Sequence, residues 1–271
     1  MAAELAELAN AEVLHSAAAG VSRLSKPFRK VANHGLAYAI MPLLNRLSRR
    51  GYVQYRPDRY ARRFAEILRY QAFWEQGATA NNRGDYARLY FLIATVEALQ
   101  SSNLPGSFAE LGVYKGCSAK ILNHLAPDRP LWLFDTFEGF PLEHARDDPS
   151  SAEAGGLAAS LAEVRDFVGA APDIHYCQGV FPETAAQVPE SERFALVHLD
   201  ADLYAPTKAG LEFFYPRLVR GGILILHDYH SGLWPGVTSA VDEFLADKPE
   251  GLVRIPDKSG TAALTRSRAP T

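Results

Sequence analysis

The spacing of hydrophobic and polar residues changes near residue 105 of the chain. Before this point, apolar residues recur at helical spacing, with a stop or kink expected at Pro42. After it, short apolar runs alternate with segments of helical spacing. The expected N-terminal helices cover residues 1–20, 21–50, 58–75 and 84–102.

The second part of the chain has the pattern of an α/β domain. Runs such as LWLF, ALVHL and ILIL are continuously apolar, as in strands buried on both faces. Strands that alternate with helices of about 10–15 residues predict a mostly parallel sheet covered on both faces. The expected strands are SFAEL, PLWLFD, DIHYCQG, FALVHLD and GGILILHDY, with GLVRIP and TAALTR as a closing antiparallel hairpin. The expected helices are 116–125, about 151–169, a short one from Pro182, 207–218 and about 236–247.

Polar side chains stand at the ends of five of these strands. In parallel sheets, ligands bind in the crevice beyond the carboxyl ends of the strands. The residues at or just after those ends are Glu110, Asp135, Gln178, Asp200 and Asp228. Their coincidence predicts one binding site at that edge of the sheet.

The first two strand ends predict a nucleoside ligand. Gly112 and Gly116 would let the backbone approach a ligand closely, although tight strand–helix packing explains them equally well. Their spacing, E-x-G-x-x-x-G, differs from the dinucleotide pattern G-x-G-x-x-G, which disfavours a dinucleotide oxidoreductase. Asp135 comes 25 residues after Glu110, where an acid suits hydrogen bonds to ribose hydroxyls; a helix cap or loop turn is the alternative. These features predict a nucleoside-bearing cofactor without a pyrophosphate.

The fourth and fifth strand ends carry a second cluster. Asp200 and Asp202 follow one strand, and His227, Asp228 and His230 follow the next. Because adjacent strands lie about 5 Å apart, Asp200 and Asp228 can face one gap and bind a hard divalent ion. An imidazole ligand would shift the preference toward Mn, Fe or Zn. For Asp202 we favour a helix cap, and for His230 exposure to solvent.

Composition narrows the class of protein only slightly. Apolar residues make up 48% and charged residues 22% of the chain, as in an ordinary globular protein. Cys117 and Cys177 form no disulfide framework, which suits a cytoplasmic location. We recognise no signal peptide, and the apolar run at 35–44 is too short to span a bilayer.

Charge is distributed unevenly along the chain. Residues 13–57 contain eight Lys or Arg and no acid, whereas the chain after Pro57 has 20 basic and 28 acidic residues. The basic arm could contact an anionic membrane surface, but we favour helices that pack on the main body or on a partner subunit. We expect no nucleic-acid partner.

Several stretches together resemble the macrocin O-methyltransferase family, a branch of the class I S-adenosylmethionine-dependent methyltransferases. They occur in family order over roughly residues 82–265. They are FAELGVYKGCSA, LFDTFEGFP, GVFPET, VHLDADLYAPTKAGLEFFYPRLVRGGILILHDY and GVTSAVDEF. The resemblance implies a Rossmann-like fold with a seven-stranded, mostly parallel sheet, helices on both faces and an antiparallel last strand. It also implies methylation of a hydroxyl group on a small molecule, such as a natural-product sugar, by an oligomer, in the simplest case a dimer.

The resemblance also implies roles for particular residues. Glu110, Gly112 and Gly116 would border the methionine part of the cofactor, Asp135 would bind the ribose, and Gln178 and Gly179 would lie near the adenine. The full predicted cofactor site comprises Glu110, Gly112, Tyr114, Gly116, Ser118, Asp135, Thr136, Phe137, Gln178, Gly179 and Asp200.

One departure from the family pattern concerns the metal. Members usually have Asp-Asp-Tyr where this chain has His227-Asp228-Tyr229. In the family, the equivalent of Asp200 and the Asp pair hold magnesium. Here Asp200, His227 and Asp228 would either keep a divalent ion with altered preference or lose it. In the second case Asp200 or His227 would act alone as general base.

The sequence therefore predicts two domains and one activity. Residues 1–75 would form a helical arm that acts as a lid or an oligomer contact, and residues 76–271 a methyltransferase domain. The predicted catalytic residues are Asp200, His227 and Asp228. The alternatives are a metal-independent methyltransferase and a degenerate fold that serves as a binding or scaffold protein.

Overall fold

The computed structural model describes residues 57–76, 82–150 and 152–267. The chain divides into two compact units, Met1–Arg62 and Arg63–Thr271. Within the first unit the structure describes one helix, α3 (Asp58–Arg62). The predictions for the basic arm at 13–56 lie outside the described residues. Everything that follows concerns the second unit.

A seven-stranded sheet runs through the second unit in the order β3-β2-β1-β4-β5-β7-β6. Strands β1 to β5 pair in parallel, whereas β7 pairs antiparallel with both β5 and β6. This confirms the predicted mostly parallel sheet and its closing hairpin. The strands are β1 (Ser107–Leu111), β2 (Leu131–Asp135), β3 (Ile174–Gln178), β4 (Phe194–Leu199), β5 (Leu218–Leu226), β6 (Val253–Arg254) and β7 (Ala262–Thr265).

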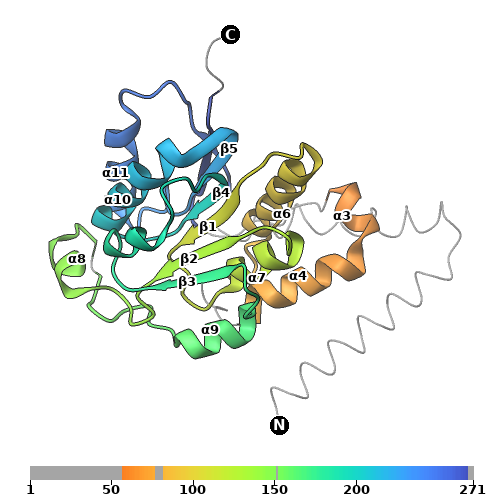
Figure 1. Cartoon of the computed structure of the whole chain (residues 1–271), viewed down its shortest axis with the longest axis horizontal. Coiled ribbons are helices and arrows are strands. Elements are labelled where there is room, and N and C mark those ends of the chain that lie inside the picture. The colour runs from red at the N-terminus through yellow and green to blue at the C-terminus, as the bar shows by residue number, and fades with distance from the viewer. Residues whose placement is uncertain (1–56, 77–81, 151, 268–271) are drawn as a thin grey trace, which may run out of the picture. The chain divides into compact units, whose positions relative to one another are not determined.

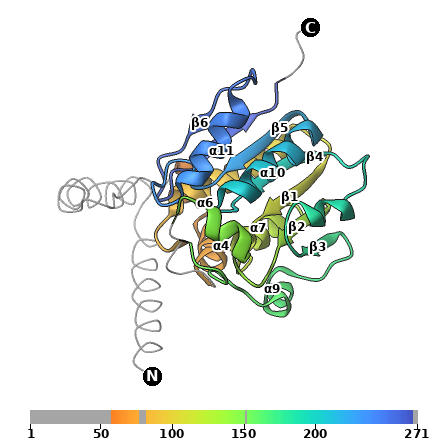
Figure 2. The same cartoon turned by 90° about the vertical axis from the view of Figure 1, so that its left-hand side faces the viewer.

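Helices cover both faces of the sheet (Figures 1 and 2). Helices α4, α6 and α9 pack against α7 on one face, and α10 packs against α11 on the other. No helix among the described residues is long and apolar enough to cross a membrane. The helices of this unit are α4 (Phe64–Gln76), α6 (Tyr86–Ser101), α7 (Cys117–Leu125), α8 (Leu142–Asp147), α9 (Leu161–Val168), α10 (Tyr204–Phe214) and α11 (Pro235–Leu245), with 3₁₀ turns η1 (Glu183–Gln187) and η2 (Tyr215–Arg217).

Several element boundaries differ from the predicted ones. The single helix expected over 58–75 is two helices, and the one expected over 151–169 is confined to α9. The segment after Pro182 is a 3₁₀ turn. Helix α10 ends at Phe214 rather than near Leu218, because Pro216 cannot continue an α-helix and Leu218 already belongs to β5.

The pleat of β1 decides which side chains reach which layer. Ala109 and Leu111 belong to the core cluster that contains Leu211 and Phe214 of α10. Since side chains alternate along a strand, Glu110 points to the opposite face, where α7 lies. The side chain of Glu110 is fully buried there. The strand therefore directs this carboxyl group under α7 and not outward from its tip.

The loop after β1 passes directly over the end of β4. Gly112 has a φ of +86°, and a Cβ at this position would lie 1.8 Å from the carbonyl oxygen of Asp200. The backbone N–H of Asp200 donates to the carbonyl of Leu111 at 2.8 Å. Two strand ends are thus in contact at a position that only glycine can occupy.

We therefore expect Gly112→Ala to lower the free energy of unfolding by at least about 2 kcal/mol, since backbone strain and overpacking each cost about 1–3 kcal/mol. Urea unfolding measures the change. The matched control is Gly251→Ala, where an added Cβ meets nothing within 4 Å. Equal stability of the two variants would contradict the close approach.

Candidate active site

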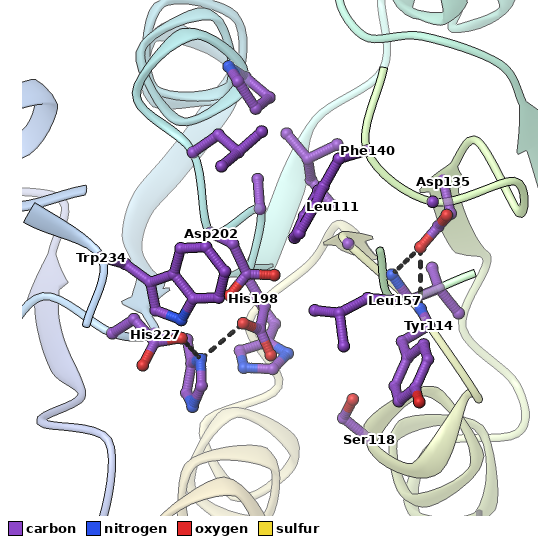
Figure 3. A pocket seen from close by; sticks show the side chains of 18 of the residues that line it. Leu111, Tyr114, Ser118, Asp135, Phe140, Leu157, His198, Asp202, His227 and Trp234 are labelled. Carbon is purple, nitrogen blue, oxygen red and sulfur yellow. Dashed lines mark hydrogen bonds and ion pairs between the residues drawn. The ribbon is translucent and has the colours of Figure 1, made fainter. Parts of the chain in front are cut away.

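A cavity of about 340 Å³ opens at the carboxyl ends of the parallel strands (Figure 3). Its wall is built from the loops that follow β1, β2, β3, β4 and β5. Of the residues predicted as functional, those that line it are Gly112, Tyr114, Ser118, Asp135, Thr136, Gly179, Asp200, His227 and Asp228. The predicted edge of the sheet is therefore the edge that carries the cavity.

Four predicted cofactor residues do not line this cavity: Glu110, Gly116, Phe137 and Gln178. Gly116 is the left-handed N-cap of α7, and a Cβ there would lie 2.7 Å from the side chain of Val168. Glycine here allows close packing of α7 on α9, which is contact between two helices rather than the strand–helix packing named as the alternative. Gln178 is exposed.

Glu110 lies behind the cavity wall. Its Oε1 accepts a hydrogen bond from the hydroxyl of Ser118 and lies 2.8 Å from Nδ1 of His198. Ser118 and His198 both line the cavity. The expectation that Glu110 would border a ligand directly is not supported by this arrangement, because the pleat of β1 directs it inward. Glu110 instead contacts Ser118 and His198, which do reach the cavity.

Asp135 at the end of β2 binds the backbone of two loops. Its Oδ2 accepts from the N–H groups of Val113 and Tyr114 at 2.7 and 2.8 Å, and its Oδ1 accepts from Phe137 at 2.7 Å. A carboxylate has about four acceptor positions, so one remains on this residue. Asp135 therefore orders the β1–α7 loop and still presents an oxygen to the cavity.

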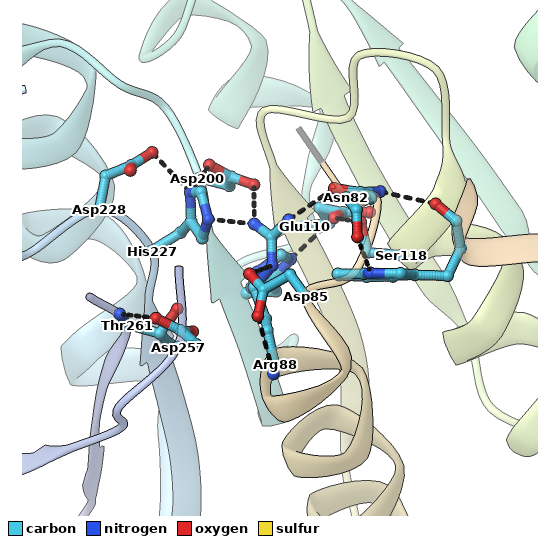
Figure 4. Close-up of polar contacts among 12 residues, drawn as sticks. Asn82, Asp85, Arg88, Glu110, Ser118, Asp200, His227, Asp228, Asp257 and Thr261 are labelled. Atoms are coloured by element: carbon cyan, nitrogen blue, oxygen red, sulfur yellow. Dashed lines mark hydrogen bonds and ion pairs between the residues drawn. The ribbon is translucent and has the colours of Figure 1, made fainter. Parts of the chain in front are cut away.

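Asp200, His227 and Asp228 meet at the other end of the cavity (Figure 4). Nδ1 of His227 lies 2.5 Å from Oδ1 of Asp200 and 2.6 Å from Oδ2 of Asp228. Burial would raise the pKa of Asp200, but the positive potential of His227 outweighs burial and holds this pKa below its usual range. Burial likewise lowers the pKa of His227, whereas Asp200 raises it more. The three side chains form one electrostatic unit.

The metal prediction can be tested against this geometry. Two carboxylates and an imidazole offer donor atoms within 4.8 Å of one another, a donor set that suits a divalent ion. However, Nδ1 of His227 lies only 2.5 and 2.6 Å from the two carboxylate oxygens, and it forms a hydrogen bond with neither of them within the described part of the chain. Ligand atoms around an octahedral ion with bonds of about 2.1 Å lie about 3 Å apart. The donor types fit a metal and the spacing does not, so the metal site stays a prediction.

The sequence did not single out Arg88 or His198, two of the polar residues in the cavity wall, and it gave Asp202, which also lines the cavity, another role. His198 stands in the buried strand β4, where a polar residue within an apolar run was the available signal. Asp202 was expected to cap the following helix, but the residue before that helix is Leu203 and no side chain caps it. Burial and the neighbouring Asp200 raise the pKa of Asp202. Exposure of His230 is confirmed.

An apolar wall faces the polar cluster. The rings of Phe140 and Trp234 meet edge to face, with centroids 5.7 Å apart. Leu233 next to them is 74% exposed. Both ends of the loop from Pro141 to Gly156 line the cavity. The cavity thus combines charged groups at its base with an apolar wall.

The backbone around the cavity is strained at four non-glycine residues. Tyr114, Leu157, Asp202 and Asp228 have φ values of +49°, +57°, +60° and +58°. Residues other than glycine rarely adopt this backbone conformation, because it costs about 1–3 kcal/mol. Such residues are concentrated at functional sites. Each of these residues follows a different strand, so the strain marks the rim of the cavity.

Comparison with known proteins identifies the family of this chain. The family model for macrocin-O-methyltransferase (TylF) matches residues 63–255. The chain belongs to this family. The match begins at Arg63, the first residue of the second compact unit.

Relatives of this methyltransferase act on natural products. Mycinamicin III 3''-O-methyltransferase of Micromonospora griseorubida is 33% identical over 58% of this chain and 67% of its own length. A tetracenomycin 4'-O-methyltransferase of Streptomyces olivaceus is 34% identical over 52% of this chain and 60% of its own length, which is less than two thirds. Among solved structures, the O-methyltransferase NovP is 27% identical over 67% of this chain and 80% of its own, with a TM-score of 0.58.

Because the carboxyl group of Glu110 is buried, we expect the stability of the folded protein to depend on pH. Burial raises the pKa of Glu110 above its ordinary 4.5, against the hydrogen bond from His198. The unfolded chain therefore ionises this group at a lower pH than the folded protein. As the pH rises above about 4.5, each pH unit in which only the unfolded chain is ionised costs about 1.4 kcal/mol of stability.

We expect Glu110→Gln to gain stability relative to the wild type between about pH 5 and pH 8, because the amide keeps an acceptor oxygen and cannot ionise. Urea unfolding of both proteins at the two pH values measures the difference in free energy of unfolding. The control is Glu138→Gln, because Glu138 is exposed. A difference that does not change with pH would show that the buried carboxyl is not the cause.

Proposed function

We propose that this protein transfers a methyl group from S-adenosylmethionine to a hydroxyl group on a sugar of a natural product. The observation that supports this proposal is the division of one cavity between Asp135, at the end of β2, and the cluster of Asp200, His227 and Asp228, after β4 and β5. A nucleoside site and a proton-accepting site then lie side by side, as methyl transfer to an alcohol requires.

The cofactor would lie across the ends of β1, β2 and β3. The free acceptor position of Asp135 suits a ribose hydroxyl, and Gly112 and Gly179 line the cavity together with it. Ser118, fixed by Glu110, would face the methionine part. This orientation places the sulfonium group toward Asp200.

The reaction is an in-line displacement. The hydroxyl oxygen attacks the methyl carbon, the C–S bond breaks, and the sulfonium becomes a neutral thioether. The hydroxyl proton passes to the carboxylate of Asp200 or Asp228. Because the methyl group is already activated, alignment of donor and acceptor is the main requirement, and alignment can lower the barrier by about 7–11 kcal/mol.

The acceptor would lie between the carboxylates and the apolar wall. The names of three relatives, one of them from Streptomyces niveus, describe enzymes that act on mycinamicin III, a rhamnosyl tetracenomycin and demethyldecarbamoylnovobiocin. In this arrangement a sugar hydroxyl would lie beside Asp200. The apolar scaffold of the same substrate would pack against Phe140 and Trp234. We further propose that residues 1–75 form a helical arm that acts as a lid or as an oligomer contact. The enzyme would work in the cytoplasm as a homo-oligomer.

Two substitutions should separate binding from chemistry. Asp135→Ala should weaken S-adenosylhomocysteine binding at least about tenfold, since a hydrogen bond to a charged group contributes about 1.5–3 kcal/mol. Asp228→Ala should leave that affinity within a few-fold and lower turnover by about 100-fold or more, the contribution of a general base.

Calorimetry with S-adenosylhomocysteine measures the first effect, and transfer of labelled methyl groups to a panel of glycosylated natural products measures the second. The control is Asp247→Asn, whose side chain is 79% exposed. Normal turnover of Asp228→Ala would refute the catalytic assignment. A wild-type protein that binds no S-adenosylmethionine or S-adenosylhomocysteine would favour the scaffold alternative.

A further inference from the structure

Arg88 places a buried positive charge in the cavity beside the candidate metal ligands. It belongs to the first turn of α6, is 4% exposed and lines the cavity. Its Nη1 is in contact with Nε2 of His227 and lies 3.9 Å from Oδ2 of Asp200 (Figure 4). Helix α6 thus brings a permanent cation to two of the three residues that the sequence assigned to a metal.

The guanidinium is fixed from several sides. Its Nη2 donates to Oδ1 of Asn82 at 2.5 Å, and its Cζ lies 4.6 Å from the ring centre of Trp74. Asp85 lies 3.4 Å from its Nε. Asn82 is itself bound to Trp74 by two hydrogen bonds of 2.9 and 3.0 Å. Displacing Arg88 would break these contacts and leave a buried charge unpaired, so the cation is a built part of the site.

Arg88 also lies against His227. Its Nη1 faces Nε2 of the ring, while Nδ1 of the same ring faces Asp200 and Asp228. A divalent ion held by Asp200, His227 and Asp228 would therefore lie close to a permanent, buried positive charge. Two cations in a buried site repel each other strongly, so the guanidinium disfavours a metal at this position.

We propose that Arg88 takes the place of a divalent ion in this site. This proposal rests on the proposed methyl transfer and concerns only how its acidic cluster is neutralised. The guanidinium balances Asp200 and Asp228, and it fixes His227 between them. The hydroxyl proton passes to a carboxylate that is already held in position, and no metal is required.

Titration with Mn²⁺ tests the proposal on the full chain. Calorimetry in the presence of S-adenosylhomocysteine should show no Mn²⁺ binding to the wild type up to about 1 mM, because the fixed cation repels the ion. Arg88→Met removes the charge and should bind Mn²⁺ at least about tenfold more tightly. Arg88→Lys keeps the charge and should behave as the wild type. The control is Arg69→Met, an exposed position on α4.

Two results would overturn the role of Arg88. One is micromolar Mn²⁺ binding by the wild type that Asp200→Asn abolishes; the other is an Arg88→Met protein that binds no more Mn²⁺ than the wild type. Should the methionine variant not fold, Arg88→Gln also removes the charge and keeps a donor for Asn82. Failure of the wild type to bind S-adenosylhomocysteine would instead refute the proposed function, so the two failures are distinguishable.

Discussion

The contact between the β1–α7 loop and the end of β4 is the constraint on which the site depends. Gly112 leaves no room for a side chain against Asp200, and Asp135 binds the amides of Val113 and Tyr114 in the same loop. The central strand of the sheet is thereby joined to its neighbours on both sides. The cavity lies over this junction, so its two halves keep a fixed separation.

The cluster of Asp200, His227 and Asp228 forms the other half of the candidate site. Strand pairing between β4 and β5 brings Asp200 beside His227 and Asp228, and α6 adds Arg88 from the opposite side. Each charge in the cluster is compensated by another, which allows it to be buried. In the proposed function this cluster accepts the proton that an alcohol loses when it is methylated.

The sequence predicted the sheet well because buried parallel strands have an unmistakable apolar pattern. It also located the ligand-binding edge, because Asp135, Asp200 and Asp228 follow strands whose ends are easily recognised. It could not predict the direction of Glu110, which depends on the pleat of β1. Nor could it find Arg88, because a basic residue on a helix gives no sign of burial until the helix is packed. The family resemblance suggested a metal, and only the packed structure shows the cation beside its ligands.

The central claim is that a sulfonium nucleoside lies over the ends of β1, β2 and β3. A crystal structure of the protein with S-adenosylhomocysteine tests it most directly. Our account predicts a ribose hydroxyl within hydrogen-bond distance of the carboxylate of Asp135 and a sulfur atom that faces Asp200. A nucleoside bound elsewhere, or one bound in this cavity without contact to Asp135, would contradict it.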